Sequence, residues 1–89
     1  MARIVFTQNI QRHVRCGPMS VQAANLREAL EAFFAETPQA RGYVLDDQGS
    51  LRRHVVVFVD GTPISDRAGL TDHIGEDAEI YVMQALSGG

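Results

Sequence analysis

The segment at residues 25–36, "NLREALEAFFAE", limits the possible folds more than any other part of the chain. Asn25 is a favourable N-cap residue, and Glu28, three positions later, completes the pattern of a capping box. The apolar side chains that recur at helical spacing are Leu26, Leu30, Phe33 and Phe34. A helix with one apolar face needs a second layer to bury that face, so we expect a sheet packed against it. Thr37-Pro38 ends the helix, because proline disfavours helical geometry at the residue before it.

Three segments have the pattern of the strands that such a sheet needs. Residues 3–7 are mostly β-branched or aromatic and place Ile4 and Phe6 on one face. Residues 55–59, "VVVFV", form an unbroken apolar run, which is typical of a strand buried on both faces or central in a sheet. Residues 79–84, "EIYVMQ", form the last strand. We assign its β-branched Ile80 and Val82 to the core, which puts Tyr81 and Met83 on the other face.

Less regular segments connect these elements. Gly17-Pro18 breaks a second strand in which Val14 and Val21 are the inward positions. Residues 39–45 are expected to form a short turn of helix, and the stretch "LDDQGSLRR" has the residue types of a tight reversal.

The segment after the apolar run contains a hairpin and a long loop. Asp60-Gly61 is a hairpin turn signal, and residues 63–64 are expected to start a short edge strand. The loop at 65–78 tucks Leu70 and Ile74 inward. The order strand, strand, helix, strand, short strand, strand predicts an α+β roll, with a mixed sheet of four to five strands and one main helix on one face. We expect residues 1–84 to form one domain.

The composition excludes several classes of function. A formal net charge of -3 argues against a nucleic-acid surface, and no stretch approaches the length that crosses a bilayer. The single cysteine, Cys16, excludes an internal disulfide and points to a reducing compartment, so we expect a soluble cytoplasmic protein. All eight basic residues are arginines, which excludes a P-loop, a Schiff base and a lysine general base. Arg52 and Arg53 are the only adjacent basic pair.

The remaining titratable side chains give no catalytic or metal-binding pattern. His13, His54 and His73 lack metal-ligand spacing and are expected at the surface or its rim. Cys16, beside Gly17-Pro18, is expected in a small semi-buried slot, with acceptance of sulfur as a persulfide as the alternative. The acidic side chains expected to form a solvated rim are Asp46, Asp47, Asp66, Asp72, Glu76 and Asp77.

The sequence finishes with "ALSGG", five residues that follow the last strand. At average glycine usage of roughly 7%, two glycines in the last two positions arise by chance in about one chain in 200. Glycine has no Cβ, so Gly88 and Gly89 expose bare backbone and a carbonyl carbon that a nucleophile can approach. We expect residues 85–89 to form a flexible C-terminal Gly-Gly tail, and a frayed terminus without a role is the alternative.

The order of elements, the "LRRHVVVFVDGTPI" hairpin, the "GEDAEIYVMQAL" approach to the last strand and the final "SGG" together resemble the β-grasp sulfur-carrier family. This ubiquitin-like family includes the small subunit of molybdopterin synthase, the thiamine sulfur carrier and the cysteine-biosynthesis sulfur carrier. The resemblance covers nearly the whole chain and implies a ubiquitin-like β-grasp fold. It also implies that the protein is a cosubstrate and not an enzyme, with no bound cofactor or metal.

The resemblance implies a role for the tail. An E1-like enzyme uses ATP to adenylate the carboxylate of Gly89, which is then converted to a thiocarboxylate. Gly88 and Ser87 thread through the enzyme, and a sulfur-accepting biosynthetic enzyme is the second partner. The partner interface implied on the exposed face of the sheet near the tail consists of Met83 and Pro63, with Leu86 as an anchor in the tail. The alternative for Met83 is that it only fills the core.

Two other functions stay open, and so does the acceptor pathway. One is a ubiquitin-like modifier that is conjugated through Gly89; the absence of lysine then forbids lysine-linked chains of the protein on itself. The other is a β-grasp binding subunit with an idle tail. The acceptor pathway is molybdopterin, cysteine, thiamine or a secondary metabolite, and a monomer is the simplest free state.

Overall fold

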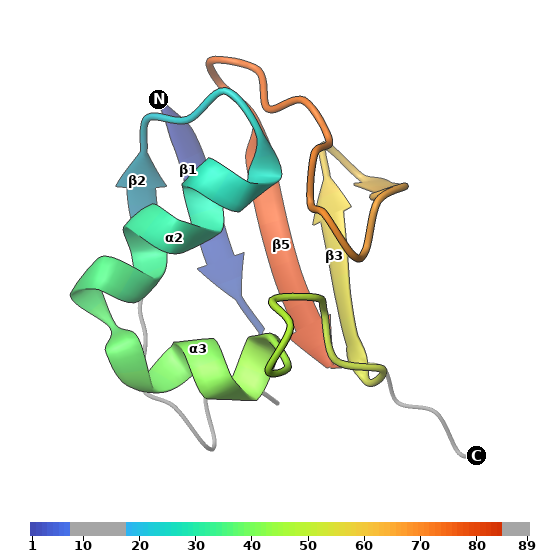
Figure 1. Cartoon of the computed structure of the whole chain (residues 1–89). Coiled ribbons are helices and arrows are strands. Elements are labelled where there is room, and N and C mark those ends of the chain that lie inside the picture. The colour runs from blue at the N-terminus through green and yellow to red at the C-terminus, as the bar shows by residue number, and fades with distance from the viewer. Residues whose placement is uncertain (8–17, 85–89) are drawn as a thin grey trace.

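The computed structural model describes residues 1–7 and 18–84, which form one sheet with two helices (Figure 1). The strands are β1 (Ala2–Phe6), β2 (Met19–Val21), β3 (Val55–Val59), β4 (Thr62–Pro63) and β5 (Glu79–Gln84), and the helices are α2 (Leu26–Glu36) and α3 (Pro38–Val44). The predictions for His13, Val14 and Cys16 lie outside the described residues. So do those for residues 85–89.

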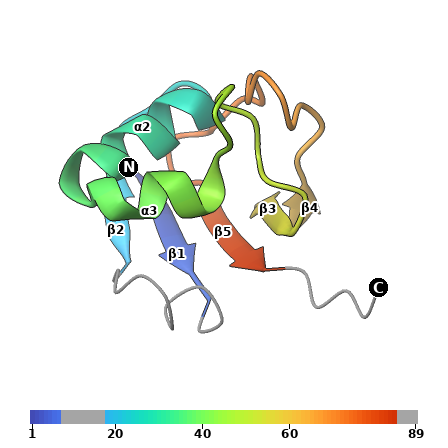
Figure 2. The same cartoon turned by 60° about the horizontal axis from the view of Figure 1, so that its bottom comes forward.

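The sheet is mixed, and its strand order is β2-β1-β5-β3-β4. β1 and β5 run parallel, whereas the other neighbouring pairs are antiparallel. Figures 1 and 2 show both helices on the same face of the sheet. The predicted α+β roll, with a mixed sheet covered on one face, is confirmed.

The helix α2 begins and ends as its sequence predicts. The side chain of Asn25 accepts a hydrogen bond from the backbone N–H of Glu28 at 2.9 Å. The Glu28 carboxylate reaches back one residue further than in a standard capping box and accepts the N–H of Ala24 at 3.0 Å. The helix ends at Glu36, before Thr37-Pro38.

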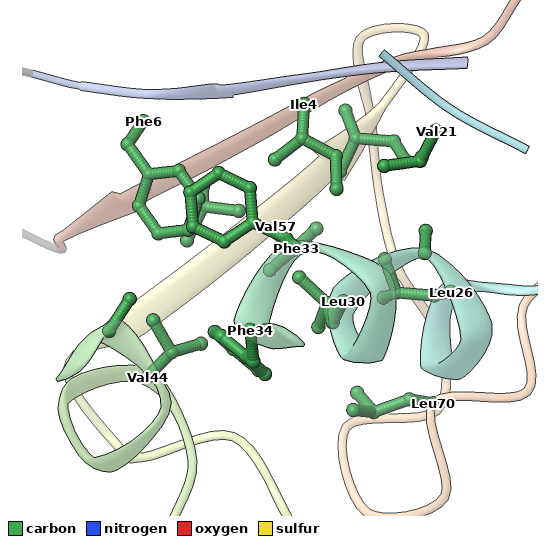
Figure 3. Packing of buried hydrophobic residues seen from close by; sticks show 14 of the residues in the cluster. Ile4, Phe6, Val21, Leu26, Leu30, Phe33, Phe34, Val44, Val57 and Leu70 are labelled. Atoms are coloured by element: carbon green, nitrogen blue, oxygen red, sulfur yellow. The ribbon is translucent and has the colours of Figure 1, made fainter. Parts of the chain in front are cut away.

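One continuous apolar core lies between α2 and the sheet. Ile4 and Phe6 of β1 and Val57 of β3 point toward Leu30 and Phe33 of α2 (Figure 3). The rings of Phe6 and Phe33 stack with their centroids 4.5 Å apart. Further buried members are Val21, Leu26, Phe34, Leu70, Ile74, Ile80 and Val82, which confirms these inward positions.

The structure corrects four of the predicted elements. β1 and β4 each begin one residue earlier than expected, and the expected short turn at 39–45 is a seven-residue helix, α3. Pro38 starts α3, because its fixed φ suits the first turn and its missing N–H has no helical partner there. β5 is the middle strand of the five, and β3 is an interior strand between β5 and β4, so β3 is not an edge strand but is also not buried on both faces. Within β3, Val55 and Val57 are fully buried, whereas Val56 and Phe58 are half-buried.

Asp66 and Asp72 organise the loop between β4 and β5, instead of lying in a solvated rim as predicted. Asp66 accepts the Thr71 hydroxyl at 2.6 Å and the Gly69 N–H at 2.8 Å. Asp72 accepts the N–H groups of Ser65 and Asp66 at 2.9 and 2.8 Å. These bonds hold Leu70 at a φ of 57°, which is uncommon for a non-glycine residue, with its side chain fully buried.

Arg27 fastens α2 to the two loops beside it. Its guanidinium donates to the carbonyl oxygens of Gly49 at 2.8 Å, Ala68 at 3.2 Å and Gly69 at 3.3 Å. Since these acceptors come from the turn after α3 and from the loop before β5, one side chain joins three parts of the chain.

Truncating the buried Leu30 should destabilise the domain strongly. We expect Leu30→Ala to lower the free energy of unfolding by about 2–5 kcal/mol, because it removes buried apolar atoms and leaves a cavity. The whole free energy of unfolding of a small domain is about 5–15 kcal/mol, so this loss is a large part of it. Urea denaturation at neutral pH measures the change. Glu36→Ala, at an exposed position of the same helix, is the control, and equal midpoints for the two variants would contradict this packing.

The loop around Asp66 should weaken in acid. Hydrogen bonds from the Thr71 hydroxyl and then from the Gly69 N–H hold the pKa of Asp66 below its ordinary value of 3.8. The ionised carboxylate therefore favours the folded state above that value, and this contribution is lost as the pH falls through the lowered pKa. We expect the difference in unfolding free energy between the wild type and Asp66→Asn to be constant above about pH 5 and to shrink below about pH 4. Urea titrations across this range measure it, and a difference that grows in acid would contradict the assignment.

Candidate functional site

The face of the sheet opposite the helices carries a row of apolar side chains. Strand register places Tyr81 of β5 beside Val5 of β1 on one side and beside Phe58 of β3 on the other. Phe58 in turn lies beside Pro63 of β4. Because neighbouring residues in register share a face, these four side chains form a row across four strands.

A second pair extends this row toward the end of β5. Met83 lies beside Val56 of β3, one step along the same face. Tyr81 is 37% exposed, Pro63 is exposed, and the others are half-buried. We call this set the open-face patch: Val5, Val56, Phe58, Pro63, Tyr81 and Met83. Apolar side chains gathered on an uncovered sheet face are typical of a surface that binds another protein.

Polar groups bound the patch at the start of β5. Arg3 lies beside Glu79 in the strand register, and the Tyr81 hydroxyl donates a hydrogen bond to the Glu79 carboxylate at 3.0 Å. This bond, together with the negative charge of Glu79, raises the pKa of the Tyr81 phenol above its ordinary value of 10.0. The phenol therefore stays neutral near pH 7 and presents its ring to the patch.

The other end of the patch lies at the root of the tail. Gln84, the last residue of β5, lies beside Val55, the first residue of β3. The Tyr43 hydroxyl of α3 donates to the Gln84 side-chain oxygen at 3.4 Å, and the His54 ring meets the Tyr43 ring edge-on at 6.0 Å. Contacts from β3, from α3 and from His54 just before β3 thus hold Gln84, after which residues 85–89 continue.

Two of the predicted interface residues, Met83 and Pro63, lie in the open-face patch. Leu86, Ser87, Gly88 and Gly89 lie outside the described residues, so their roles stay predictions. The sequence analysis missed Val56 and Phe58, although their alternation with Val55 and Val57 in one apolar run was a usable signal. It read the run as a strand buried on both faces or central in a sheet, whereas neither helix of residues 18–84 covers the second face of β3 (Figure 2).

Within residues 1–7 and 18–84, no group of three or more histidine, cysteine or acidic side chains is arranged to hold a metal ion. As predicted, His73 is exposed and His54 is half-buried at the rim. Neither helix of the described chain has the length and apolar character needed to cross a membrane. One surface hollow, of about 470 Å³, is lined by residues that include Ala2, Gln22 and Ile74 and therefore lies at the far end of the sheet from Gln84.

The sequence matches no protein-family model and no curated protein, whereas solved structures with a similar fold exist. SAMP1 from Haloferax volcanii superposes with a TM-score of 0.81 at 20% identity, covering 99% of this chain and 98% of that one. A chain of the Amycolatopsis orientalis BexX/CysO complex gives 0.83 at 13% identity, with both chains fully covered. CysO of Mycobacterium tuberculosis gives 0.81 at 16% identity, covering 97% of this chain and 100% of that one.

The chain has the ubiquitin-like β-grasp fold. These neighbours superpose over nearly the whole of this chain, and the predicted fold is confirmed. The identities, at or below 20% for these three, establish the fold and leave the chemistry to be argued from this chain's own residues.

Proposed function

We propose that this β-grasp protein is a sulfur carrier that is activated at the carboxylate of Gly89. The observation that carries the proposal is the position of the open-face patch on β5, the strand that leads directly into "ALSGG". A surface for docking an enzyme then ends at Met83, six residues before Gly89 in the sequence. The fold of the structural relatives SAMP1 and CysO supports the same reading.

The chemistry divides into two displacements. A carboxylate is a poor electrophile, so one oxygen of the Gly89 carboxylate first attacks the α-phosphorus of ATP, and pyrophosphate leaves. A sulfur nucleophile then attacks the acyl carbon, the bond to AMP breaks, and the thiocarboxylate forms. The activating enzyme supplies ATP and binding groups, whereas this chain supplies an acyl carbon without a neighbouring side chain and is consumed as a cosubstrate.

Each tail residue has a distinct part in this proposal. Gly88 and Ser87 are small enough to pass through a narrow channel to a nucleotide site, and Leu86 anchors the tail at the channel mouth. The thiocarboxylate at Gly89 then donates its sulfur to a second, sulfur-accepting enzyme. One shallow apolar surface of moderate affinity suits a protein that must bind two partners in turn.

A ubiquitin-like modifier is the second candidate, because SAMP1 of Haloferax volcanii is described as a small archaeal modifier protein. In that case a lysine of a target protein attacks the activated Gly89 carbonyl and forms an isopeptide bond. This chain contains no lysine, so such conjugates would not extend into lysine-linked chains of the protein itself. A binding subunit with an idle tail is the third candidate.

The mass of the intact protein separates these candidates. After incubation with ATP, a sulfur donor and an adenylating enzyme from the same source, we expect a gain equal to the replacement of one oxygen by sulfur. A variant that lacks Gly88 and Gly89 should show no gain. Higher-mass conjugates on target proteins would favour the modifier. Neither product, with no adenylate detectable, would leave a binding subunit.

A charge placed in the open-face patch should slow activation without unfolding the protein. We expect Met83→Arg to lower kcat/KM for the carrier by at least about tenfold, because a buried unpaired charge opposes docking. Ala35→Arg adds the same charge at an exposed position of α2 and should have little effect. Steady-state kinetics with adenylating enzyme give both values, and thermal unfolding shows whether each variant is folded. Equal kinetics for the two folded variants would exclude the open-face patch as the docking surface.

A further inference from the structure

The adjacent pair Arg52-Arg53 has no role in the function proposed above. Arg53 is exposed, and Arg52 and His54 are half-buried. Together with Asp46 and Leu51 these three residues line a shallow hollow of about 280 Å³. We call Arg52, Arg53 and His54 the basic cluster.

The basic cluster lies beside the root of the tail. It directly precedes Val55, whose register partner is Gln84, and antiparallel partners lie about 5 Å apart. Arg53 is two residues before Val55, which adds at most about 7 Å. The five tail residues span at most about 18 Å when fully extended. An enzyme that encloses Gly89 therefore brings its surface close to Arg53.

Among the described residues, positive side chains outnumber negative ones at this end of the sheet. The Arg52 Nε–H donates to the carbonyl of Gly42 at 2.8 Å, and Arg67 donates to the carbonyl of Arg52 at 2.8 Å, which brings a third guanidinium to the cluster. The opposing carboxylates on the neighbouring turn are Asp46 and Asp47. Asp46 already accepts the N–H groups of Gln48 and Ser50.

Negative charge gathers at the other end of β5. The Asp60 carboxylate accepts the N–H of Glu79 at 2.9 Å, and Asp77 lies 3.7 Å from the α-amino group of Met1. Arg3 is the basic side chain beside Glu79. A chain with a net charge of -3 thus turns a basic end toward whatever receives its tail.

We infer that the basic cluster binds acidic side chains on the enzyme that activates Gly89, an inference that rests on the proposed function. Exposed guanidinium groups recognise carboxylates, and such contacts at an interface rim raise the association rate and orient the partner. The negative net charge of the chain would repel an acidic partner at long range. Within a Debye length, however, the local positive charge of the basic cluster decides the interaction. A free phosphate is disfavoured, because Asp46 lies in the hollow and the Nε–H of Arg52 is already bonded.

A pair of matched variants tests this contact. Arg53→Gln and Arg41→Gln remove the same charge from exposed positions, one beside the tail root and one on α3, on the helix side of the sheet. The measured quantity is kcat/KM for activation at salt concentrations from about 50 to about 300 mM. We expect Arg53→Gln to lower kcat/KM about threefold at low salt, less at high salt, and Arg41→Gln to leave it nearly unchanged.

Each result bears on the inference. Equal losses for both variants would mean that only net charge matters, and no loss for Arg53→Gln would mean that the contact is absent; either overturns the inference. A wild-type chain that is not activated at all contradicts the proposed function instead. In that case backbone amide shifts with poly-L-glutamate as probe test the cluster directly. Shifts at Arg53 and His54 that vanish in Arg53→Gln support it, whereas shifts with sodium phosphate alone overturn it.

Discussion

The burial of one face of α2 against the sheet holds the rest of the structure in place. Phe33 stacks on Phe6 of β1, and Leu30 lies among side chains of the sheet (Figure 3). Since one helix face supplies most of the second layer, β1, β3 and β5 turn their fully buried side chains toward it. Within residues 1–7 and 18–84 no element covers the opposite face, and that face carries the candidate site.

The central strand β5 joins this core to the proposed chemistry. Ile80 and Val82 are fully buried beneath α2, while Tyr81 and Met83, between and after them, belong to the open-face patch. The strand is paired on both sides, which fixes the position of Gln84 at its end. A tail that leaves from a strand held in this way starts from a defined point, and both the patch and the basic cluster surround that point.

Local sequence patterns predicted the elements better than their places in the sheet. Asn25 and Thr37-Pro38 set the bounds of α2 through short-range capping and backbone geometry, so they could be read directly. The exposure of the second face of β3 could not be read from the sequence, because an apolar run does not reveal whether that face meets a helix or another protein. Arg27 gave no local signal either, since its three acceptors lie in loops 22 to 42 residues away along the chain.

The sequence by itself determined the fold class and the inward faces of the strands. These follow from residue type and spacing, which act over a few neighbouring positions. Only the tertiary structure decided that Val5, Phe58, Tyr81 and Pro63 form one row, that β5 is central, and that Arg53 lies beside the tail root. Strand pairing joins residues far apart in the chain, and its register is set by the packing of the whole core against α2.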